Sequence, residues 1–308
     1  MDIISLGEPM MELSELVQPN GLTYYLPGFG GDTSNFAVAA SRSGASVAYF
    51  TRIGKDAFGD RFLKLWEDEG IDTSLVVRDP ESFTGMYFIT YDKEGHKFTY
   101  FRKNSAASLM TPDEVPEEAI ANSRLLHISG ISQAISTSAC DAVFKAVEVA
   151  KKAGSKISYD PNFRPRLWGN DRARAVIDYT ASLCDIFLPS LDEAEVITGI
   201  KSPEGIIEYY LGLGARIVAL KMGKEGAIAS DGSETAYVEG IKLETIDATG
   251  AGDTFDGFFV AMLLTGRKIA QALEYANVAA ALSTRGHGAV APIPRYIEVE
   301  DFLSKNRI

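Results

Sequence analysis

Short apolar runs alternate with longer segments of helical periodicity along most of this chain, and that alternation restricts the fold more than any other feature. Strands that alternate with helices build βαβ units, whose parallel strands form a sheet covered by helices on both faces. We therefore predict a doubly wound, mostly parallel α/β fold whose ligands bind beyond the carboxyl ends of the strands. The strand-like runs cover residues 3–6, 47–53, 125–128, 156–159, 186–188 and 217–221, and the helical patterns cover 35–43, 140–153, 254–264 and 269–283.

Two stretches, 10–26 and 84–103, interrupt this alternation. The second, TGMYFITYDKEGHKFTYFRK, indicates a β-hairpin around a turn at residues 92–95. In that register Tyr87 faces Tyr100, and period-two alternation gives the hairpin two distinct faces. One face carries Tyr87, Tyr100 and Arg102, and the other carries Met86, Phe88 and Phe101.

These interruptions predict a small β lid on a large α/β domain. The large domain is expected to comprise residues 1–9, 29–82 and 107–308, and the lid residues 10–28 and 83–106. Neither face of the hairpin is simply polar. The hairpin therefore either packs on its own domain or covers a substrate with one face and a second subunit with the other. The second interpretation predicts a homo-oligomer that assembles through the lid.

The composition narrows the class of partner. The chain has 308 residues and a formal net charge of -12, so DNA or RNA is an unexpected partner, because nucleic-acid binding usually needs a basic face. The first residues, MDIISLGEP, lack the basic segment and cleavage site of a signal peptide, and no apolar stretch approaches the roughly 20 residues of a membrane helix. With only Cys140 and Cys184 as cysteines, these features predict a reduced, cytoplasmic protein without a membrane partner.

The segment DATGAGD at residues 247–253 carries the strongest functional signal. It directly precedes an apolar helical stretch, TFDGFFVAMLL, so its small residues stand at the start of a helix. Backbone amides at such a helix start form an anion hole for charge that develops on a transferred phosphoryl group. Asp253 adds a carboxylate that can accept the proton of an attacking hydroxyl. The alternative is a glycine-rich helix entry with a capping Asp, but the full seven-residue pattern favours catalysis.

This segment resembles the DTxGAGD signature of the pfkB, or ribokinase-like, carbohydrate kinases, with Ala248 in place of the usual threonine. The resemblance spans nearly the whole chain, because further motifs follow in the expected order: GFGGDTSNFAVAASRSG at 28–44, RIGKDAFGD at 52–60, DPNFRPRLW at 160–168 and LKMGKEGAIA at 220–229. The chain has no Walker A sequence and no GxGxxG after its first strand, which argues against a P-loop enzyme and a Rossmann dehydrogenase.

The resemblance implies an ATP-dependent kinase that uses Mg²⁺, and it leaves open whether a monovalent cation also binds. It makes Asp253 the base and assigns the anion hole to Gly250, Ala251 and Gly252. The implied nucleotide-binding positions are Lys221, Gly223, Gly226, Thr249 and Asn277. Glu193 matches the glutamate that organises Mg²⁺ through water, although Ser190 stands where the family has asparagine.

Arginines predict the class of substrate. Arg102 in the hairpin and Arg164 in DPNFRPRLW both fall in the region where the family binds sugars. Two guanidinium groups there favour a carboxylate or phosphate on the substrate, because the planar fork of arginine matches those groups. The alternative is that the arginines of DPNFRPRLW are surface residues near acidic neighbours. FGGDTSN, YFRKNSAAS, HISGIS and DPNFRPRLW together resemble the 2-keto-3-deoxygluconate kinase branch of the family. That resemblance implies substrate contacts at Gly30, Gly31, Asn35, Tyr87, Tyr100, Arg102 and Arg164.

Two alternatives remain open. One is a neutral-sugar kinase of the fructokinase or ribokinase type in the same family. The other is a catalytically silent sugar-binding regulator on the same fold, which the intact Asp253 and its GAG segment disfavour. The loop TRGHGAVAP at 284–292 carries His287 where related kinases can place an acidic residue, so the contacts at that end of the sugar stay undetermined. A lone histidine in a glycine-rich loop is expected to make local hydrogen bonds and not to act as a catalyst.

Overall fold

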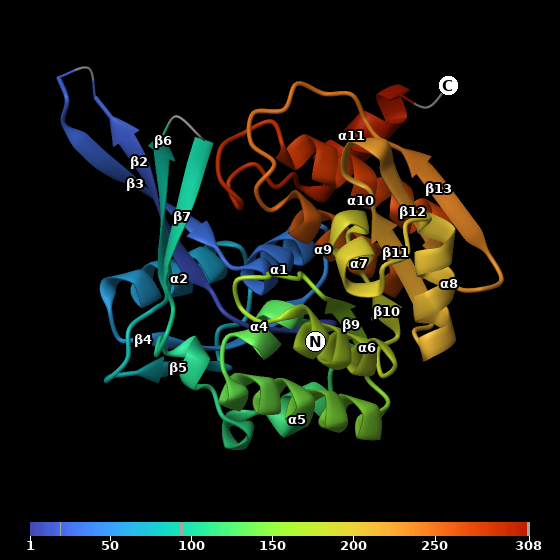
Figure 1. The fold of residues 1–308 in the computed structure, drawn as a ribbon, viewed down its shortest axis with the longest axis horizontal. Helices are drawn as coiled ribbons and strands as arrows, with labels where there is room; N and C mark the ends of the chain where they lie inside the picture. The colour runs from blue at the N-terminus through green and yellow to red at the C-terminus, as the bar shows by residue number, and fades with distance from the viewer. Residues whose placement is uncertain (19, 93–94, 307–308) are drawn as a thin grey trace.

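The computed structural model describes residues 1–18, 20–92 and 95–306, and these residues form a large and a small β-sheet (Figure 1). The large sheet has the strand order β13–β12–β11–β10–β9–β8–β1–β4–β5, and neighbouring strands are parallel except in the β11–β12 and β12–β13 pairs. The predicted mostly parallel α/β sheet is confirmed. Its strands are β1 (Ile3–Leu6), β4 (Val47–Gly54), β5 (Val76–Asp79), β8 (Leu125–Ser129), β9 (Lys156–Asp160), β10 (Ile186–Phe187), β11 (Ile217–Lys221), β12 (Gly226–Ser230) and β13 (Thr235–Glu239).

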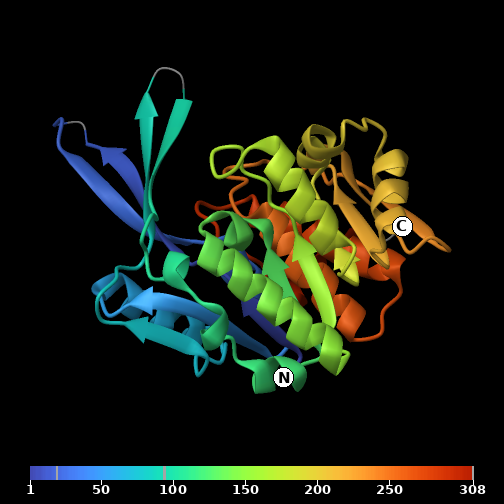
Figure 2. The ribbon, with the colours of Figure 1, turned by 60° about the horizontal axis from the view of Figure 1, so that its bottom comes forward.

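Helices cover both faces of the large sheet (Figure 2). Successive side chains of a strand point to opposite faces, so Ile3 packs into one apolar core and Ile4 into the other. That is why every residue of β1 and β8 is buried, including the polar Ser5, His127 and Ser129. One face carries α1 (Asp32–Arg42), α2 (Ala57–Asp68), α9 (Ala251–Leu264), α10 (Ile269–Ser283) and α11 (Tyr296–Asn306), and the other carries α3 (Glu117–Ala121), α4 (Gly130–Ala134), α5 (Thr137–Ala153), α6 (Asn170–Ala181), α7 (Leu191–Thr198) and α8 (Pro203–Leu213). None of the helices in the described parts of the chain is long and apolar enough to cross a membrane.

The small sheet is the lid, which projects from the large domain in both ribbon views (Figures 1 and 2). Its strand order is β3–β2–β6–β7, with β2 and β6 parallel. The hairpin register is the predicted one, with Tyr87 opposite Tyr100, although the tip of the predicted turn, at 93–94, lies outside the described residues. The strands are β2 (Met10–Val17), β3 (Thr23–Gly30), β6 (Met86–Asp92) and β7 (Gly95–Phe101), so β3 continues two residues beyond the expected lid limit at 28.

The two faces of the lid have different surroundings. Met10, Tyr87 and Ile89 form a small apolar cluster of the lid. On the other face, Met86 packs against the core of the large domain, which agrees with the interpretation that the hairpin packs on its own domain. Phe88 and Phe101 remain at the outside of the lid, where their rings contact each other edge to face with centroids 5.7 Å apart.

Candidate active site

A cavity of about 1770 Å³ lies between the lid and the large domain. It is lined by the start of α1, the start of α9, residues that follow β9, the end of β11 and the lid strands, as the position of ligands in α/β folds requires. Every residue that the sequence assigned to catalysis, to the substrate, to the nucleotide or to the metal lines this one cavity. His287 is not among the described residues that line it.

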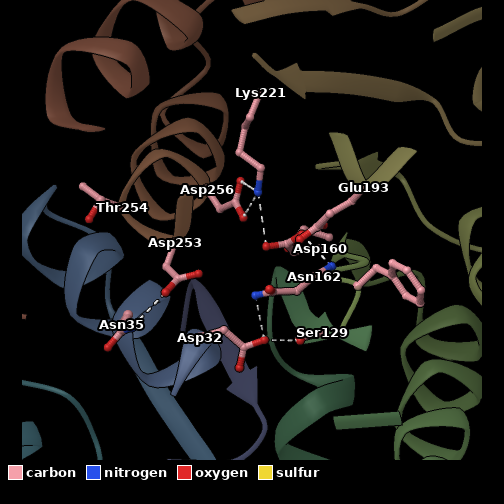
Figure 3. Close-up of polar contacts among 12 residues, drawn as sticks. Asp32, Asn35, Ser129, Asp160, Asn162, Glu193, Lys221, Asp253, Thr254 and Asp256 are labelled. Atoms are coloured by element: carbon pink, nitrogen blue, oxygen red, sulfur yellow. Dashed lines mark hydrogen bonds and ion pairs between the residues drawn. The ribbon is translucent and has the colours of Figure 1, made fainter. Parts of the chain in front are cut away.

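The first turn of α9 presents the candidate base. Gly250 precedes the helix with a left-handed φ of 76°, and a side chain there would meet the Ala289 carbonyl at 2.8 Å, so only glycine fits. Asp253 is half-buried, and its Oδ2 accepts a hydrogen bond from Asn35 Nδ2 at 2.8 Å (Figure 3). The pKa of Asp253 is raised to about 7, mainly by burial and then by the nearby charge of Asp32, while the Asn35 hydrogen bond opposes the rise. A carboxyl group with such a pKa suits proton transfer near neutral pH.

A buried cluster of three charged residues lies beside this turn (Figure 3). Lys221 at the end of β11 donates from Nζ to Asp160 Oδ2 at 3.2 Å and to the two Asp256 oxygens at 3.0 and 2.8 Å. Burial raises the pKa of Asp256 well above its ordinary value, whereas contacts with Lys221 help keep the pKa of Asp160 low. Asp256 therefore takes up a proton more readily than Asp160, and Lys221 contacts both carboxyl groups.

A second network fixes the carboxylate of Asp32 at the start of α1. Its Oδ2 accepts hydrogen bonds from Ser129 Oγ and from Asn162 Nδ2, the latter at 3.1 Å (Figure 3). Asn162 has a left-handed φ of 37°, which is uncommon for a residue other than glycine. The backbone N–H of Asn162 donates to Asp160 Oδ1 at 3.0 Å, so Asn162 connects the carboxylates of Asp32 and Asp160.

The two predicted carboxylate-binding arginines each have a glutamate partner. Arg102 donates from Nε to Glu8 Oε2 at 3.0 Å, and its Nη2 also contacts that oxygen; the Glu8 side chain is 0% exposed. Arg164 donates to Glu193 Oε1 at 2.6 Å, but its side chain is 47% exposed. Burial and the nearby Asp160 raise the pKa of Glu193 above its ordinary value. The sequence placed both arginines in one region but did not indicate these partners.

The remaining predicted residues are those assigned to the nucleotide and those of the lid. Thr249 donates to Asp247 Oδ1 at 2.7 Å, and Asn277 donates to the Glu239 carbonyl at 2.9 Å. Gly226 has a left-handed φ of 102°, and a side chain there would meet the Val238 carbonyl at 2.0 Å. In the lid, the Tyr87 hydroxyl donates to Glu12 Oε2 at 2.6 Å.

Sequence reasoning missed a set of carboxylates that support this site. Asp32 and Asp160 lay inside motifs that were recognised, but no role was assigned to them. A charged residue directly after or between apolar strand residues was the available signal, because such a side chain is rarely buried without a partner. The missed residues are Glu8, Glu12, Asp32, Asp160 and Asp256.

Comparisons with known proteins agree with this geometry. The model of the pfkB family carbohydrate kinases matches residues 2–295. The chain is 35% identical to the 2-dehydro-3-deoxygluconokinase of Bacillus subtilis, with 100% of this chain and 97% of that protein covered. It is 34% identical to the 2-dehydro-3-deoxygluconokinase of Thermoproteus tenax, with coverage of 98% and 94%. Among solved structures, a putative Ribokinase II from E. coli in complex with ATP and Mg²⁺ has a TM-score of 0.91 and 30% identity, and 99% of each chain is covered.

Proposed function

The chain belongs to the pfkB family of carbohydrate kinases, and from that premise we propose that it transfers the γ-phosphoryl group of ATP to a hydroxyl of 2-keto-3-deoxygluconate. The observation that carries the choice of substrate is the arginine pair. Arg102 comes from the lid and Arg164 from the loop after β9, and both line the cavity that holds Asp253. A sugar acid offers a carboxylate to these guanidinium groups, whereas a neutral sugar does not.

Asp253 is the proposed catalytic base. It takes the proton of the substrate hydroxyl while the hydroxyl oxygen forms a bond to the γ-phosphorus. The bond between that phosphorus and the bridging oxygen breaks, and ADP leaves with the electron pair. The amide of Ala251 donates to the Ala248 carbonyl at 3.2 Å, whereas the amides of Gly252 and Asp253 have no acceptor within the helix, so these two can stabilise the negative charge on the transferred group.

The acidic lining of the cavity fits a hydrated divalent cation. Asp160 and Glu193 both line the cavity and offer oxygen atoms, which Mg²⁺ prefers and often binds through water. When bound, Mg²⁺ would neutralise charge on the β- and γ-phosphates. Without such a cation, these carboxylates would repel a triphosphate. Lys221 and the glycine turn at 223–226 are proposed to hold the nucleotide. Asn277 is proposed to lie beside its adenine ring.

The guanidinium group of Arg102 has one nitrogen that can donate to the substrate. Glu8 occupies Nε and Nη2, and among the described residues Nη1 has no partner. Its guanidinium carbon also lies 5.5 Å from the centroid of the Tyr100 ring, which holds it by a cation–π contact. Arg102 and the exposed Arg164 both line the cavity, so each offers a guanidinium group to a substrate carboxylate, which supports the sugar-acid proposal.

Catalytic efficiency on two substrates tests this proposal. A charge-assisted hydrogen bond contributes roughly 1.5–3 kcal/mol, so Arg164→Ala should lower kcat/KM for 2-keto-3-deoxygluconate by about 10- to 100-fold. The value for fructose should stay nearly unchanged, and Arg164→Lys should recover only part of the loss. An equal decline for both substrates would assign Arg164 to another task. A wild-type preference for fructose would favour the neutral-sugar alternative.

The outer face of the lid supports a further part of the proposal, which is assembly with a second copy of the chain. The Tyr25 and Phe101 side chains are 43% and 50% exposed, and both rings contact Phe88, so an aromatic surface stands ready for a second copy of the chain. Light scattering should give at least a dimer at micromolar concentration, and Phe101→Lys should weaken it. A wild-type monomer at that concentration would contradict assembly through the lid.

Use of ATP supports the cytoplasmic location expected from the sequence.

A further inference from the structure

The contact between Asn35 and Asp253 joins two helices that are far apart in the sequence. Asn35 lies on α1 and Asp253 in the first turn of α9, 218 residues later. Asn35 is only 4% exposed, and its Nδ2 donates to Oδ2 of the carboxylate at 2.8 Å. Its Oδ1 is buried and has no partner among the described residues. The amide cannot turn over without breaking its bond to the carboxylate, so its orientation is set by Asp253.

The distance between these helices depends on a glycine one turn further along. Gly257 follows Asp253 by four residues on α9, and Ala39 follows Asn35 by four residues on α1. A side chain on Gly257 would lie 2.6 Å from Ala39 Cβ, 2.8 Å from the Phe36 carbonyl oxygen and 2.8 Å from the backbone nitrogen that follows Ala39. Backbone atoms cannot rotate away as a flexible side chain can. Any side chain at position 257 would therefore push α1 and α9 apart and separate Asn35 from Asp253.

We propose that Asn35 and Gly257 are positioning residues for the catalytic base. Gly257 lets α1 and α9 approach closely, and Asn35 then holds one carboxylate oxygen of Asp253 and leaves the other for the substrate hydroxyl. The donated hydrogen bond also keeps the base in its ionised form. This inference rests on the proposed role of Asp253, and it gives Asn35 a task separate from contact with the sugar.

The electrostatic surroundings of Asp253 explain why it needs a neutral donor. Burial raises its pKa, Asp32 on α1 and Asp160 at the end of β9 add negative charge, and Lys221 at the end of β11 acts in the opposite direction. Tyr87 of the lid also faces the carboxylate. Asn35 favours the ionised form without adding a charge. Loss of its hydrogen bond should raise the pKa of Asp253 further, so less of the base is ionised at neutral pH.

The pH dependence of kcat/KM for the sugar acid separates this role from simple substrate contact. In Asn35→Ala the midpoint of the acid limb should move up by about one to two pH units, because one charge-assisted hydrogen bond is lost. Activity at neutral pH should fall by about 5- to 50-fold beyond any change in KM and recover partly at about pH 9. Ile131→Val is the matched control, because Ile131 lines the cavity but has no proposed role in binding or catalysis. Its midpoint should stay at the wild-type value.

A second pair of variants leaves both Asn35 and the cavity lining intact. Gly257→Ala should move the midpoint in the same direction as Asn35→Ala, with ADP binding by calorimetry unchanged. Ala39→Gly removes the facing methyl group without separating the helices, so its midpoint should match the wild type. Wild-type midpoints in Asn35→Ala, or in folded Gly257→Ala, would overturn the inference. If Gly257→Ala does not fold, Asn35→Ala decides. Loss of turnover in Asp253→Asn tests the proposed base separately.

Discussion

Replacing Arg102 by alanine should destabilise the protein as well as weaken substrate binding. The Glu8 carboxylate is fully buried, and Arg102 is its ionic partner, with Ser105 Oγ as a second donor at 3.2 Å. Removal of one member of a buried ion pair costs about 3–5 kcal/mol, because the remaining charge stays buried without compensation. Since Ser105 remains as a donor, we expect the lower limit, about 3 kcal/mol. The unfolding entropy of a chain of this length is roughly 0.65 kcal/mol/K, so the melting temperature should fall by about 5 °C.

Three variants, compared with the wild type by calorimetry and urea unfolding, test this reasoning. Arg102→Ala should show the full loss, and Arg102→Ala combined with Glu8→Gln should regain at least half of it, because no unpaired charge remains. Arg164→Ala is the matched control. Its side chain is 47% exposed, so its ion pair with Glu193 should contribute less than about 1 kcal/mol.

The reasoning is refuted if Arg102→Ala is as stable as the wild type, or if the double variant is no more stable than the single one. The result also decides which variant can report on the substrate. If Arg102→Ala loses stability as expected, its kinetic defect combines a missing contact with a disturbed lid base. Arg164→Ala is then the cleaner probe of the substrate carboxylate.

Three further predictions follow from the site and its surroundings. The pKa of Asp253 is raised to about 7 and the base must be ionised, so kcat/KM should fall about tenfold per pH unit below that value and level off above it; a flat profile would contradict the assignment. Burial lowers the pKa of His127 to about 3, so below about pH 6.5 the unfolded chain binds a proton that the native state does not. The stability measured in urea should therefore fall by up to ~1.4 kcal/mol for each unit by which the pH is lowered. His127→Gln should remove this contribution between about pH 6 and 4. Burial raises the pKa of Asp256 well above its ordinary value and favours its protonated form, so Asp256→Asn should cost less stability than Lys221→Met, which should lose about 3–5 kcal/mol by leaving Asp160 unpaired; equal losses in urea unfolding would contradict this order.

Local patterns in the sequence were sufficient for the elements and for the register of the lid hairpin. Period-two alternation around a turn fixes which residues of a hairpin face each other, so Tyr87 and Tyr100 could be paired without a structure. The glycine-rich segment before α9 likewise predicted a helix start with Asp253 in its first turn. Both features depend on residues close together in the chain.

The partners of the site residues could not be predicted, because they come from distant segments. Glu8 precedes Arg102 by 94 residues, and Asp160 precedes Lys221 by 61 residues. Nothing local to an arginine shows whether its charge is free or already neutralised by a buried glutamate. For the same reason the sequence could not decide whether Met86 packs on its own domain or faces a second subunit, since packing against the large domain is a long-range property.

The small apolar cluster of the lid has a consequence for amide hydrogen exchange. Among the described residues, the lid buries Met10, Tyr87 and Ile89 in a cluster of its own, whereas the large domain has two extended cores. A unit with so few buried contacts should open at a lower free energy than the sheet beneath it. Amides of β2, β3, β6 and β7 should therefore exchange together and well before those of β1. A bound sugar acid that touches Tyr87 from below should slow this whole group at once, so exchange in the lid reports occupancy of the cavity.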